Sequence, residues 1–287
     1  MATAVLLAQT EARFDVVSIK PAEQLTAAGM ALPGFHRGLR MDPGRVDIRF
    51  MPLRQLITTA YGVTPSRMVG PGWLMRPELG GARIFDIQAK MPAGSSKTQV
   101  PEMLRGMLAD RFRLVVHRES RQTEVMALVV SANGPKLQPA TGDASPIAAP
   151  AGRKASQDYD TGLNDGHLQV FPAGKSEIAI HSSPDGVSKV TTENLPGGMS
   201  HYEVSGVTMD WLAKSLDGLG GMPVINATGI TGRYNAVYDF PRVGTAPAER
   251  MAGVQTGLAK LGLKLDKRKA SVEFLVVDHV EKDPAAN

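Results

Sequence analysis

The stretch LADRFRLVVHRESRQTEVMALVVS, from Leu108 to Ser131, decides the fold that we expect for this chain. It reads as the end of a helix, a basic strand, a polar turn and an apolar strand, so it predicts a helix followed by a hairpin. Nearly the same order returns in LAKLGLKLDKRKASVEFLVVDHV, from Leu258 to Val280. This recurrence indicates that one structural unit occurs twice in the chain.

The residues before the first stretch predict the rest of the first unit. Strands are expected in FDVVSIKP (14–21), in GRVDIRFM (44–51) and around 84–87, where apolar and polar residues alternate. Helices are expected at 52–61, which starts with Pro52 and is followed by Gly62, and at 99–111, where apolar residues recur at helical spacing.

The second half has the same predicted elements in the same order. Strands are expected at 177–183, 201–207 and 237–240, and helices at 208–220 and 248–262. We therefore predict an α+β fold with an internal duplication of about 120 residues. Each copy has the order strand, strand, helix, strand, helix, hairpin, and packs its two helices on a small, mainly antiparallel sheet. The alternative is that short amphipathic helices followed by hairpins recur by chance.

A change of composition separates the two predicted units. Residues 139–164, PATGDASPIAAPAGRKASQDYDTGLN, are rich in Ala, Pro, Gly, Ser and Asp, as expected for a flexible linker or a long exposed loop. The predicted organisation is a residual signal or tail at 1–10, a first α+β repeat at 11–138, and a second repeat at 165–287.

Composition limits the class of protein. Hydrophobic residues make up 43% of the chain and charged residues 21%, which is typical of a soluble globular protein. No stretch approaches the roughly 18 apolar residues of a membrane-spanning helix. The net charge of +4 is too small to indicate nucleic-acid binding. The absence of cysteine excludes disulfides, thiolate metal sites and a cysteine nucleophile.

The N-terminus is similar to the end of a secretory signal. Ala4 to Ala8 is a short apolar piece followed by polar residues, without the basic region that precedes such a piece in a signal peptide. We expect a clipped or mis-started export signal, and hence a periplasmic or secreted protein. The alternative is a frayed N-terminus of a cytosolic protein.

Several motifs, in order, resemble one known family. They are FDVVSIKPA (14–22), GPGWL (70–74), FDIQAKMP (85–92), MLRGMLADRFRLVVHRESRQTEVMALVVSANGPKL (103–137), TGITGRYNAVYDF (228–240) and GLKLDKRKASVEFLVVDHVEKDP (262–284). Together they are similar to the soil-associated bacterial protein family of unknown function. The resemblance implies an exported protein, whose domain is attached in some relatives to a membrane metallopeptidase of the antibiotic-sensing type. It implies no reaction, cofactor or catalytic residue.

Familiar catalytic signatures are absent from the sequence. It contains no G-x-S-x-G elbow, no P-loop and no H-E-x-x-H motif. His167, His181 and His201 have no second histidine at i+2 or i+4, so we predict no metal site and no cofactor. Catalytic residues that converge from distant segments stay an open alternative.

Trp73 and two histidines are candidates for contact with a ligand or partner. Trp73 follows GPG, so it is either a rigid contact platform or a plug that closes the core of the first half. His117 and His279 lie near Glu119 and Asp278, and a histidine beside a carboxylate is typical of proton-transfer groups. Neighbours on one strand point to opposite faces, however, which favours a structural or surface role.

The other candidates are cations. Arg118 and Lys267 belong to the basic runs RLVVHRESR (113–121) and KLDKRK (264–269). These runs predict either a positive rim for an anionic glycan, a lipid or a partner protein, or charged edges that prevent aggregation. Arg233 ends the turn motif TGITGR (228–233), which we interpret as a hairpin-like turn, with a phosphate-binding nest as the alternative.

We predict from these features an exported binding or protein-interaction module without catalytic activity. Its partner is an unknown protein, small molecule or glycan, and not nucleic acid; the oligomeric state stays open. The cleft between the two predicted units is the expected place for a ligand, because pockets favour domain junctions. A secreted hydrolase-like enzyme and an extracytoplasmic sensor domain are the alternatives.

Overall fold

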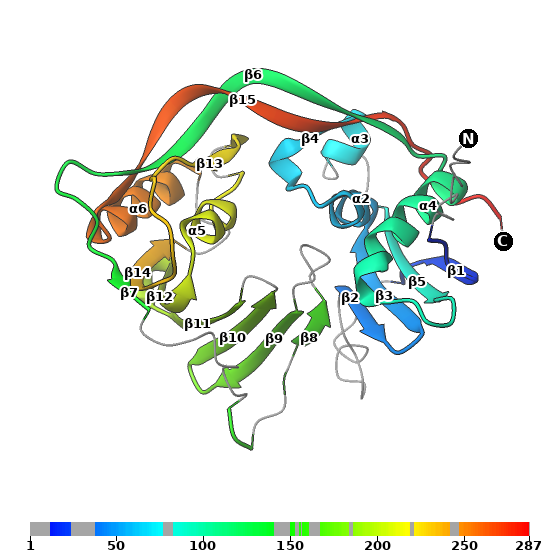
Figure 1. The fold of residues 1–287 in the computed structure, drawn as a ribbon, viewed down its shortest axis with the longest axis horizontal. Coiled ribbons are helices and arrows are strands. Elements are labelled where there is room, and N and C mark those ends of the chain that lie inside the picture. The colour runs from blue at the N-terminus through cyan, green and yellow to red at the C-terminus, as the bar shows by residue number, and fades with distance from the viewer. Residues whose placement is uncertain are drawn as a thin grey trace, which may run out of the picture.

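The computed structural model describes residues 12–23, 38–76, 83–140, 150–152, 155, 157–160, 167–183, 186–218, 221–241 and 247–286. These residues form two lobes that stand side by side, each with helices packed on strands (Figure 1). A long two-stranded ribbon arches over both lobes, and a row of strands runs beneath them. The predicted signal or tail at 1–10 lies outside the described residues.

The first lobe is built from the elements between β1 and α4. Its strands are β1 (Val16–Pro21), β2 (Gly38–Asp42), β3 (Arg45–Pro52), β4 (Met68–Val69) and β5 (Ile84–Lys90). Its helices are α2 (Leu53–Tyr61), α3 (Gly72–Met75) and α4 (Val100–Phe112), with short 3-10 turns at η1 (Pro65–Arg67) and η3 (Lys97–Gln99). The helices predicted at 52–61 and 99–111 are thus confirmed.

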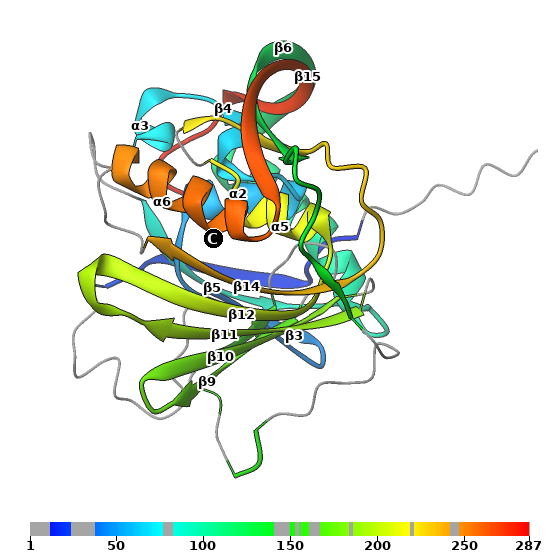
Figure 2. The ribbon, with the colours of Figure 1, turned by 90° about the vertical axis from the view of Figure 1, so that its left-hand side faces the viewer.

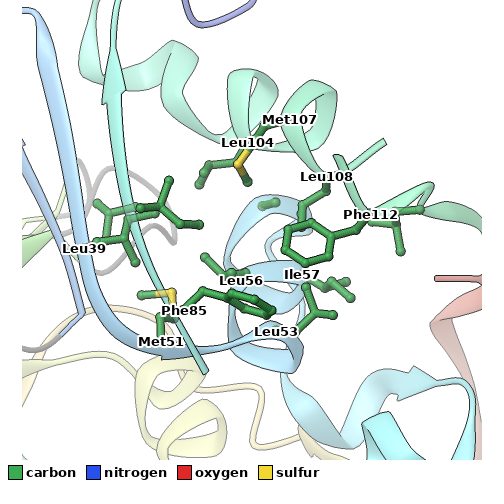
Figure 3. Packing of buried hydrophobic residues seen from close by; sticks show 14 of the residues in the cluster. Leu39, Met51, Leu53, Leu56, Ile57, Phe85, Leu104, Met107, Leu108 and Phe112 are labelled. Atoms are coloured by element: carbon green, nitrogen blue, oxygen red, sulfur yellow. The ribbon is translucent and has the colours of Figure 1, made fainter. Parts of the chain in front are cut away.

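The core of the first lobe lies where α2 and α4 meet the strands (Figure 3). Leu53 and Ile57 of α2 are buried together with Leu108 of α4, because apolar residues at helical spacing share one face of each helix. Phe85 from β5 packs against Phe112 edge to face, with 5.1 Å between the ring centroids. This packing fixes α2 and the loop that follows it.

The second lobe contains the corresponding helices and strands of the second half. They are β12 (Met199–Val207), α5 (Met209–Ser215), β13 (Val224–Asn226), β14 (Tyr234–Pro241) and α6 (Pro247–Lys260), with a 3-10 turn at η4 (Pro196–Gly198). The helix expected at 208–220 ends earlier, at Ser215, and the helix expected at 248–262 occurs as α6. Leu212 and Leu258 are buried in its core with Tyr238 and Phe240.

One sheet passes beneath both lobes. Among the described residues, its 11 strands have the order β1-β5-β3-β2-β8-β9-β10-β11-β12-β14-β7. The strands not yet given are β7 (Gln138–Pro139), β8 (Gln157–Asp160), β9 (His167–Ala173), β10 (Ser176–Ser183) and β11 (Gly186–Asn194). The helices lie on the side of this sheet that faces the ribbon (Figure 2). A single residue pair, Leu39 with Asp160, joins β2 to β8, so part of the segment expected as a linker is a strand of this sheet.

The ribbon consists of β6 (Val115–Val130) and β15 (Leu263–His279), which pair antiparallel along their whole length. β6 leaves the first lobe after α4 and ends in the second core, where Met126 and Leu128 are buried. β15 runs the opposite way and ends in the first core, where Leu275 and Val277 are buried. Each core therefore contains residues from both halves of the sequence. Short parallel pairings of β4 with β15 and of β13 with β6 attach the lobes to the ribbon.

The predicted α+β duplication, with two helices on a separate small sheet in each half, is wrong. Strands of both halves belong to one sheet, and the two expected hairpins are single long strands that pair with each other. Their middle segments, 117–124 and 266–273, contain no Gly, Pro or Asn, which are among the residues that a tight hairpin turn favours most. Opposite charges pair across the ribbon instead, as Lys267 does with Glu124 at 2.9 Å.

Candidate functional site

A cavity of about 360 Å³ lies at the junction of the two lobes and the ribbon. The first lobe contributes the end of α2 and the loop after it, the second lobe contributes α5 and β13, and the ribbon contributes one residue from each strand. The lining residues are Gly62, Val63, Thr64, Arg67, Arg118, Asp210, Ala213, Lys214, Asp217, Val224, Ile225, Asn226 and Glu273.

The first-lobe wall depends on how α2 ends. Gly62 adopts a left-handed conformation with φ 65°, which glycine tolerates because it has no Cβ. The backbone N–H of Val63 then donates to the carbonyl oxygen of Thr58 at 3.1 Å. This turn directs the chain away from the helix and places Thr64 and Arg67 against the second lobe.

The second-lobe wall is one face of α5 and the turn after it. Thr208 caps this helix, since its Oγ1 accepts the backbone N–H of Trp211 at 3.1 Å. Asp210, Lys214 and Asp217 follow at a spacing of four and three residues, which brings polar side chains to one side of the helix.

Hydrogen bonds join the two walls directly. Arg67 donates from Nη2 to the carbonyl oxygen of Val224, 3.0 Å away. The hydroxyl of Ser66 donates to Oδ2 of Asp217. Oδ1 of the same carboxylate accepts the backbone N–H of Val224 at 2.8 Å. Asp217 therefore holds the loop of the first lobe and the strand β13 of the second lobe together.

The cavity contains three cations and three carboxylates, but their pairing is uneven. Arg118 and Glu273 form an ion pair with each other across the ribbon. The Asp210 carboxylate accepts a hydrogen bond from Nδ2 of Asn226 at 2.9 Å. Within the described part of the chain, Arg67 and Lys214 have no ion-pair partner.

The Nε atom of Arg67 lacks a hydrogen-bond acceptor among the described residues, and Lys214 has a lowered pKa. The Nε atom is also buried. Burial lowers the pKa of Lys214, and the nearby charge of Arg67 lowers it further, while Asp217 acts in the opposite direction.

Histidine–carboxylate pairs lie elsewhere in the fold. Nδ1 of His201 is 2.7 Å from Oδ1 of Asp239, whose Oδ2 accepts a hydrogen bond from Nζ of Lys260 at 2.7 Å. These bonds hold the pKa of Asp239 below its usual range. None of the described residues that line the cavity is a histidine. In the same described residues, no cluster of three His, Cys, Asp or Glu side chains has the arrangement needed for a metal ion.

Four of the predicted contact residues lie on the ribbon, among them the cations Arg118 and Lys267. Arg118 lines the cavity, where Nη2 donates to the carbonyl oxygen of Tyr61 at 3.1 Å in addition to the ion pair with Glu273. Lys267 is paired with Glu124, so the basic runs are largely neutralised within the ribbon rather than forming a continuous positive rim.

The other predicted contact residues are not among the described residues that line the cavity. Trp73 packs on the first core, and Nζ of Lys282 lies 5.6 Å from its ring centroid. His117 lies on the ribbon with Nδ1 2.8 Å from the carboxylate of Asp278 on the neighbouring strand. His279 is exposed at the end of the ribbon. Trp73, His117 and His279 therefore lie toward the end of the ribbon at the first lobe, outside the cavity.

Arg233 is also remote from the cavity. Its guanidinium donates to the carbonyl oxygen of Val187 on β11. Gly206 makes room for it, because a Cβ at that position would lie 3.0 Å from Nη2 of Arg233. This arginine therefore fastens neighbouring strands of the second lobe.

Sequence reasoning missed Arg67, Lys214 and Asp217. The spacing of Asp210, Lys214 and Asp217 is that of residues on one side of a helix, but an ordinary exposed helix has the same pattern. Arg67 stands in a short loop with no distinguishing motif. These three residues come together only in the tertiary structure, where the two lobes and the ribbon meet.

Among the described residues, no helix has the length and apolar character that a membrane crossing requires.

Comparison with known proteins identifies a family. Residues 54–280, which include all the described lining residues of the cavity, match the family described as protein of unknown function (DUF3738). No curated protein and no solved structure matches the chain.

Proposed function

The chain belongs to this DUF3738 family of unknown function, and we propose that it is a binding module that holds a small molecule in the cavity between its lobes. The observation that carries the proposal is the cavity itself. Its volume of about 360 Å³ lies in the range of small-molecule sites, and its lining combines four apolar side chains with eight polar or charged ones. Both lobes and the ribbon contribute to it, so an occupant would contact all three.

The composition of the cavity favours binding over catalysis. Nucleophilic catalysis by a hydroxyl needs a base within hydrogen-bond reach. Thr64, which lines the cavity, has its Oγ1 3.2 Å from Ser66 Oγ and not beside a base. The hydroxyl of Ser66 does reach a carboxylate, that of Asp217, but Ser66 is not among the described residues that line the cavity. The imidazoles of His117 and His201 are paired with carboxylates elsewhere. A secreted hydrolase therefore has less support than a binding module.

We further propose that the protein acts outside the cytoplasm, in the periplasm or as a secreted protein. The apolar piece Ala4 to Ala8 and the resemblance to exported soil-associated proteins support this localisation. A sensor role is compatible with the same cavity, because a ligand at a lobe junction changes the balance between lobe arrangements. Fractionation of the native host would test the localisation.

A ligand screen with a blocked cavity tests the binding proposal. Thr64→Trp places a large side chain in the loop that lines the cavity, and Thr256→Trp, at an exposed position on α6, is the matched control. We expect compounds that raise the melting temperature of the unchanged protein and of Thr256→Trp, but not that of Thr64→Trp. If no compound depends on residue 64 in this way, the proposal is wrong.

A further inference from the structure

We propose that the two lobes turn against each other about the ribbon, and that two hydrogen bonds, which we call the latch, hold them in the closed arrangement of this structure. The latch consists of the bond from Ser66 to the carboxylate of Asp217 and the bond from Arg67 to the carbonyl oxygen of Val224. This inference goes beyond the proposed function, because it concerns a motion of the chain itself and needs no ligand.

The two lobes have separate hydrophobic cores. Among the described residues, the buried apolar cluster around Ile57 and Leu108 shares no member with the cluster around Leu212 and Leu258. Two bodies in one chain are expected to move relative to each other unless a large apolar interface joins them. The separate cores therefore meet the first condition for a motion of the lobes as rigid bodies.

An apolar contact between the lobes lies at the ribbon. Val125, Val272 and Phe274 of the ribbon form a small buried cluster. Val69 from β4 of the first lobe and Ile225 from β13 of the second lobe both pack against this cluster. Because β4 and β13 also pair with the strands of the ribbon, these contacts persist when the lobes turn about it. The cluster therefore lies where a pivot is needed.

The middle of the ribbon is suited to bending. It is only two strands wide between the short pairings with β4 and β13, and an isolated pair of strands is marginally stable by itself. A segment with few buried apolar contacts changes shape at low cost. Its exposed side chains include Ser120, Gln122, Glu124, Lys267, Lys269 and Ser271.

The sheet beneath the lobes offers little resistance to the same motion. In the described part of the chain, β2 of the first lobe is joined to β8 through the single residue pair Leu39 and Asp160. This joint lies at the side of the molecule opposite to the ribbon (Figure 1). A turn of the lobes about the ribbon therefore has to open only a minimal strand pairing at this joint.

The latch lies between the ribbon and this joint and is polar. Water replaces such hydrogen bonds when they open, so that the net loss for one bond shifts an equilibrium only about fivefold. Arg67, Asp217 and Val224 are also among the residues that line the cavity. Opening of the latch therefore separates two walls of the cavity, and the arrangement of the lobes controls access to it.

Distances between two spin labels test the motion. The chain contains no cysteine, so that labels at Ala109→Cys on α4 and Ala259→Cys on α6, both exposed positions, report the separation of the lobes. We expect a main, closed distance and a second, open distance. Ser66→Ala should raise the ratio of open to closed molecules by about fivefold or more. One narrow distance that is the same with and without Ser66→Ala would overturn the inference.

Ser215→Ala is the matched control for the loss of a serine hydroxyl. Ser215 is exposed, and its hydroxyl donates to the carbonyl oxygen of Leu212 within α5, so that the bond stays inside the second lobe. The label distances should not change in this variant. An equal shift in Ser66→Ala and Ser215→Ala would overturn the assignment of the latch.

A reversible cross-link tests the latch from the opposite direction. A Cβ at Gly218 would lie 3.7 Å from Cβ of Ser66, and disulfides join Cβ atoms that are about 3.5–4.5 Å apart. Ser66→Cys combined with Gly218→Cys should therefore form a disulfide that fixes the lobes. A cysteine at Gly218 has to adopt a φ of 78°, but the oxidised and reduced forms share this cost, so their comparison is unaffected by it.

Hydrogen exchange at the joint beneath the lobes gives the readout. If the lobes turn, the segments around Leu39 and Asp160 should exchange more slowly in the oxidised form than in the reduced form, although the disulfide is formed at the latch. Equal exchange of these segments in the two forms would overturn the inference.

Discussion

Arg67 in the first lobe donates a hydrogen bond from Nη2 to the carbonyl oxygen of Val224 in the second lobe, 3.0 Å away. The two residues are far apart in the sequence, and the bond crosses the junction at the wall of the cavity. The same junction contains the Asp217 carboxylate, which accepts hydrogen bonds from both lobes. The candidate site therefore includes residues that also hold the two lobes together.

Loss of Asp217 should loosen the junction. Asp217→Ala removes the acceptor for the hydroxyl of Ser66 and the N–H of Val224, and we expect it to lower the free energy of unfolding by about 1–3 kcal/mol. Asp210→Ala is the control, since Asp210 is exposed and accepts one bond, from Asn226. Urea unfolding measures both, and equal losses would contradict the bridging role.

Lys214 should react faster than an ordinary surface lysine. Burial and the neighbouring Arg67 lower its pKa, so a larger fraction of the amine is neutral and nucleophilic at pH 8 to 9. Competitive acylation followed by mass spectrometry should modify Lys214 ahead of Lys267, and Arg67→Gln should slow the modification of Lys214. Identical rates in the two proteins would contradict the electrostatic coupling.

The sign of the effect on stability follows from the same lowered pKa. The folded state binds fewer protons at Lys214 than the unfolded chain does in the window between the lowered pKa and the ordinary pKa of lysine. The free energy of unfolding should therefore rise with pH through that window, and Lys214→Gln should remove this rise. Urea titrations across this pH range provide the measurement.

Gly257 in α6 should not tolerate a methyl group. A Cβ there would lie 2.6 Å from the ring of Phe240 and 2.7 Å from the carbonyl oxygen of Asp239. Gly257→Ala should destabilise the protein although alanine is the better helix former, because the helix must move away from β14. Gly106→Ala in α4 meets only Arg13 at 3.7 Å and should stabilise the protein by up to about 1 kcal/mol. Thermal unfolding of both variants shows whether Gly257→Ala lowers the melting temperature while Gly106→Ala raises it.

The end of β15 should be essential to the first lobe. Leu275 comes from the second half of the sequence but is 1% exposed in the first core. Leu275→Ala should cost about 2–5 kcal/mol, as for other buried leucines. Hydrogen exchange should show the loss of protection in α2 and α4, and exposed Glu281→Ala serves as the control. Protection lost only in α5 and α6 would contradict the exchange of strands between lobes.

Asp239 should make the second lobe sensitive to acid. Its pKa is lowered first by Lys260 and then by His201, so its ion pairs stabilise the fold above the ordinary pKa of aspartate, about 4, and cease to do so as the pH falls through the lowered value. Asp239→Asn should cost about 1 kcal/mol or less at pH 7 and nothing in strong acid. A cost independent of pH, in urea unfolding at both pH values, would contradict this role.

Part of the candidate site was accessible from the sequence. Arg118 was selected as a member of a basic run, and the junction between the halves was the expected place for a ligand. Arg67 and Lys214 were not selected, because a cation without a partner looks the same in sequence as a cation in an ion pair. Whether a charge is neutralised depends on side chains from other segments, as the pairing of Arg118 with Glu273 shows.

Helix positions were predictable because they depend on local periodicity. The apolar residues of α2 and α4 repeat at the helical period and face one core, so a short window of sequence contains the signal. Strands β1, β3, β5, β10 and β12 were predictable from the alternation of apolar and polar residues. Strands β2, β9 and β11 were not predicted, and β8 lies in the segment expected as a linker. The pairing partners of the strands were not predictable, since any strand offers the same backbone donors and acceptors to any other.

The sequence by itself determined where the helices α2, α4 and α6 form, and which family the chain belongs to. Only the tertiary structure decided that β6 and β15 pair with each other instead of folding into two hairpins. The physical reason is that each strand places its two ends in different cores, with Leu128 buried in the second lobe and Leu275 in the first. Burying both ends and pairing opposite charges between them stabilises the long ribbon, and no local pattern records that gain.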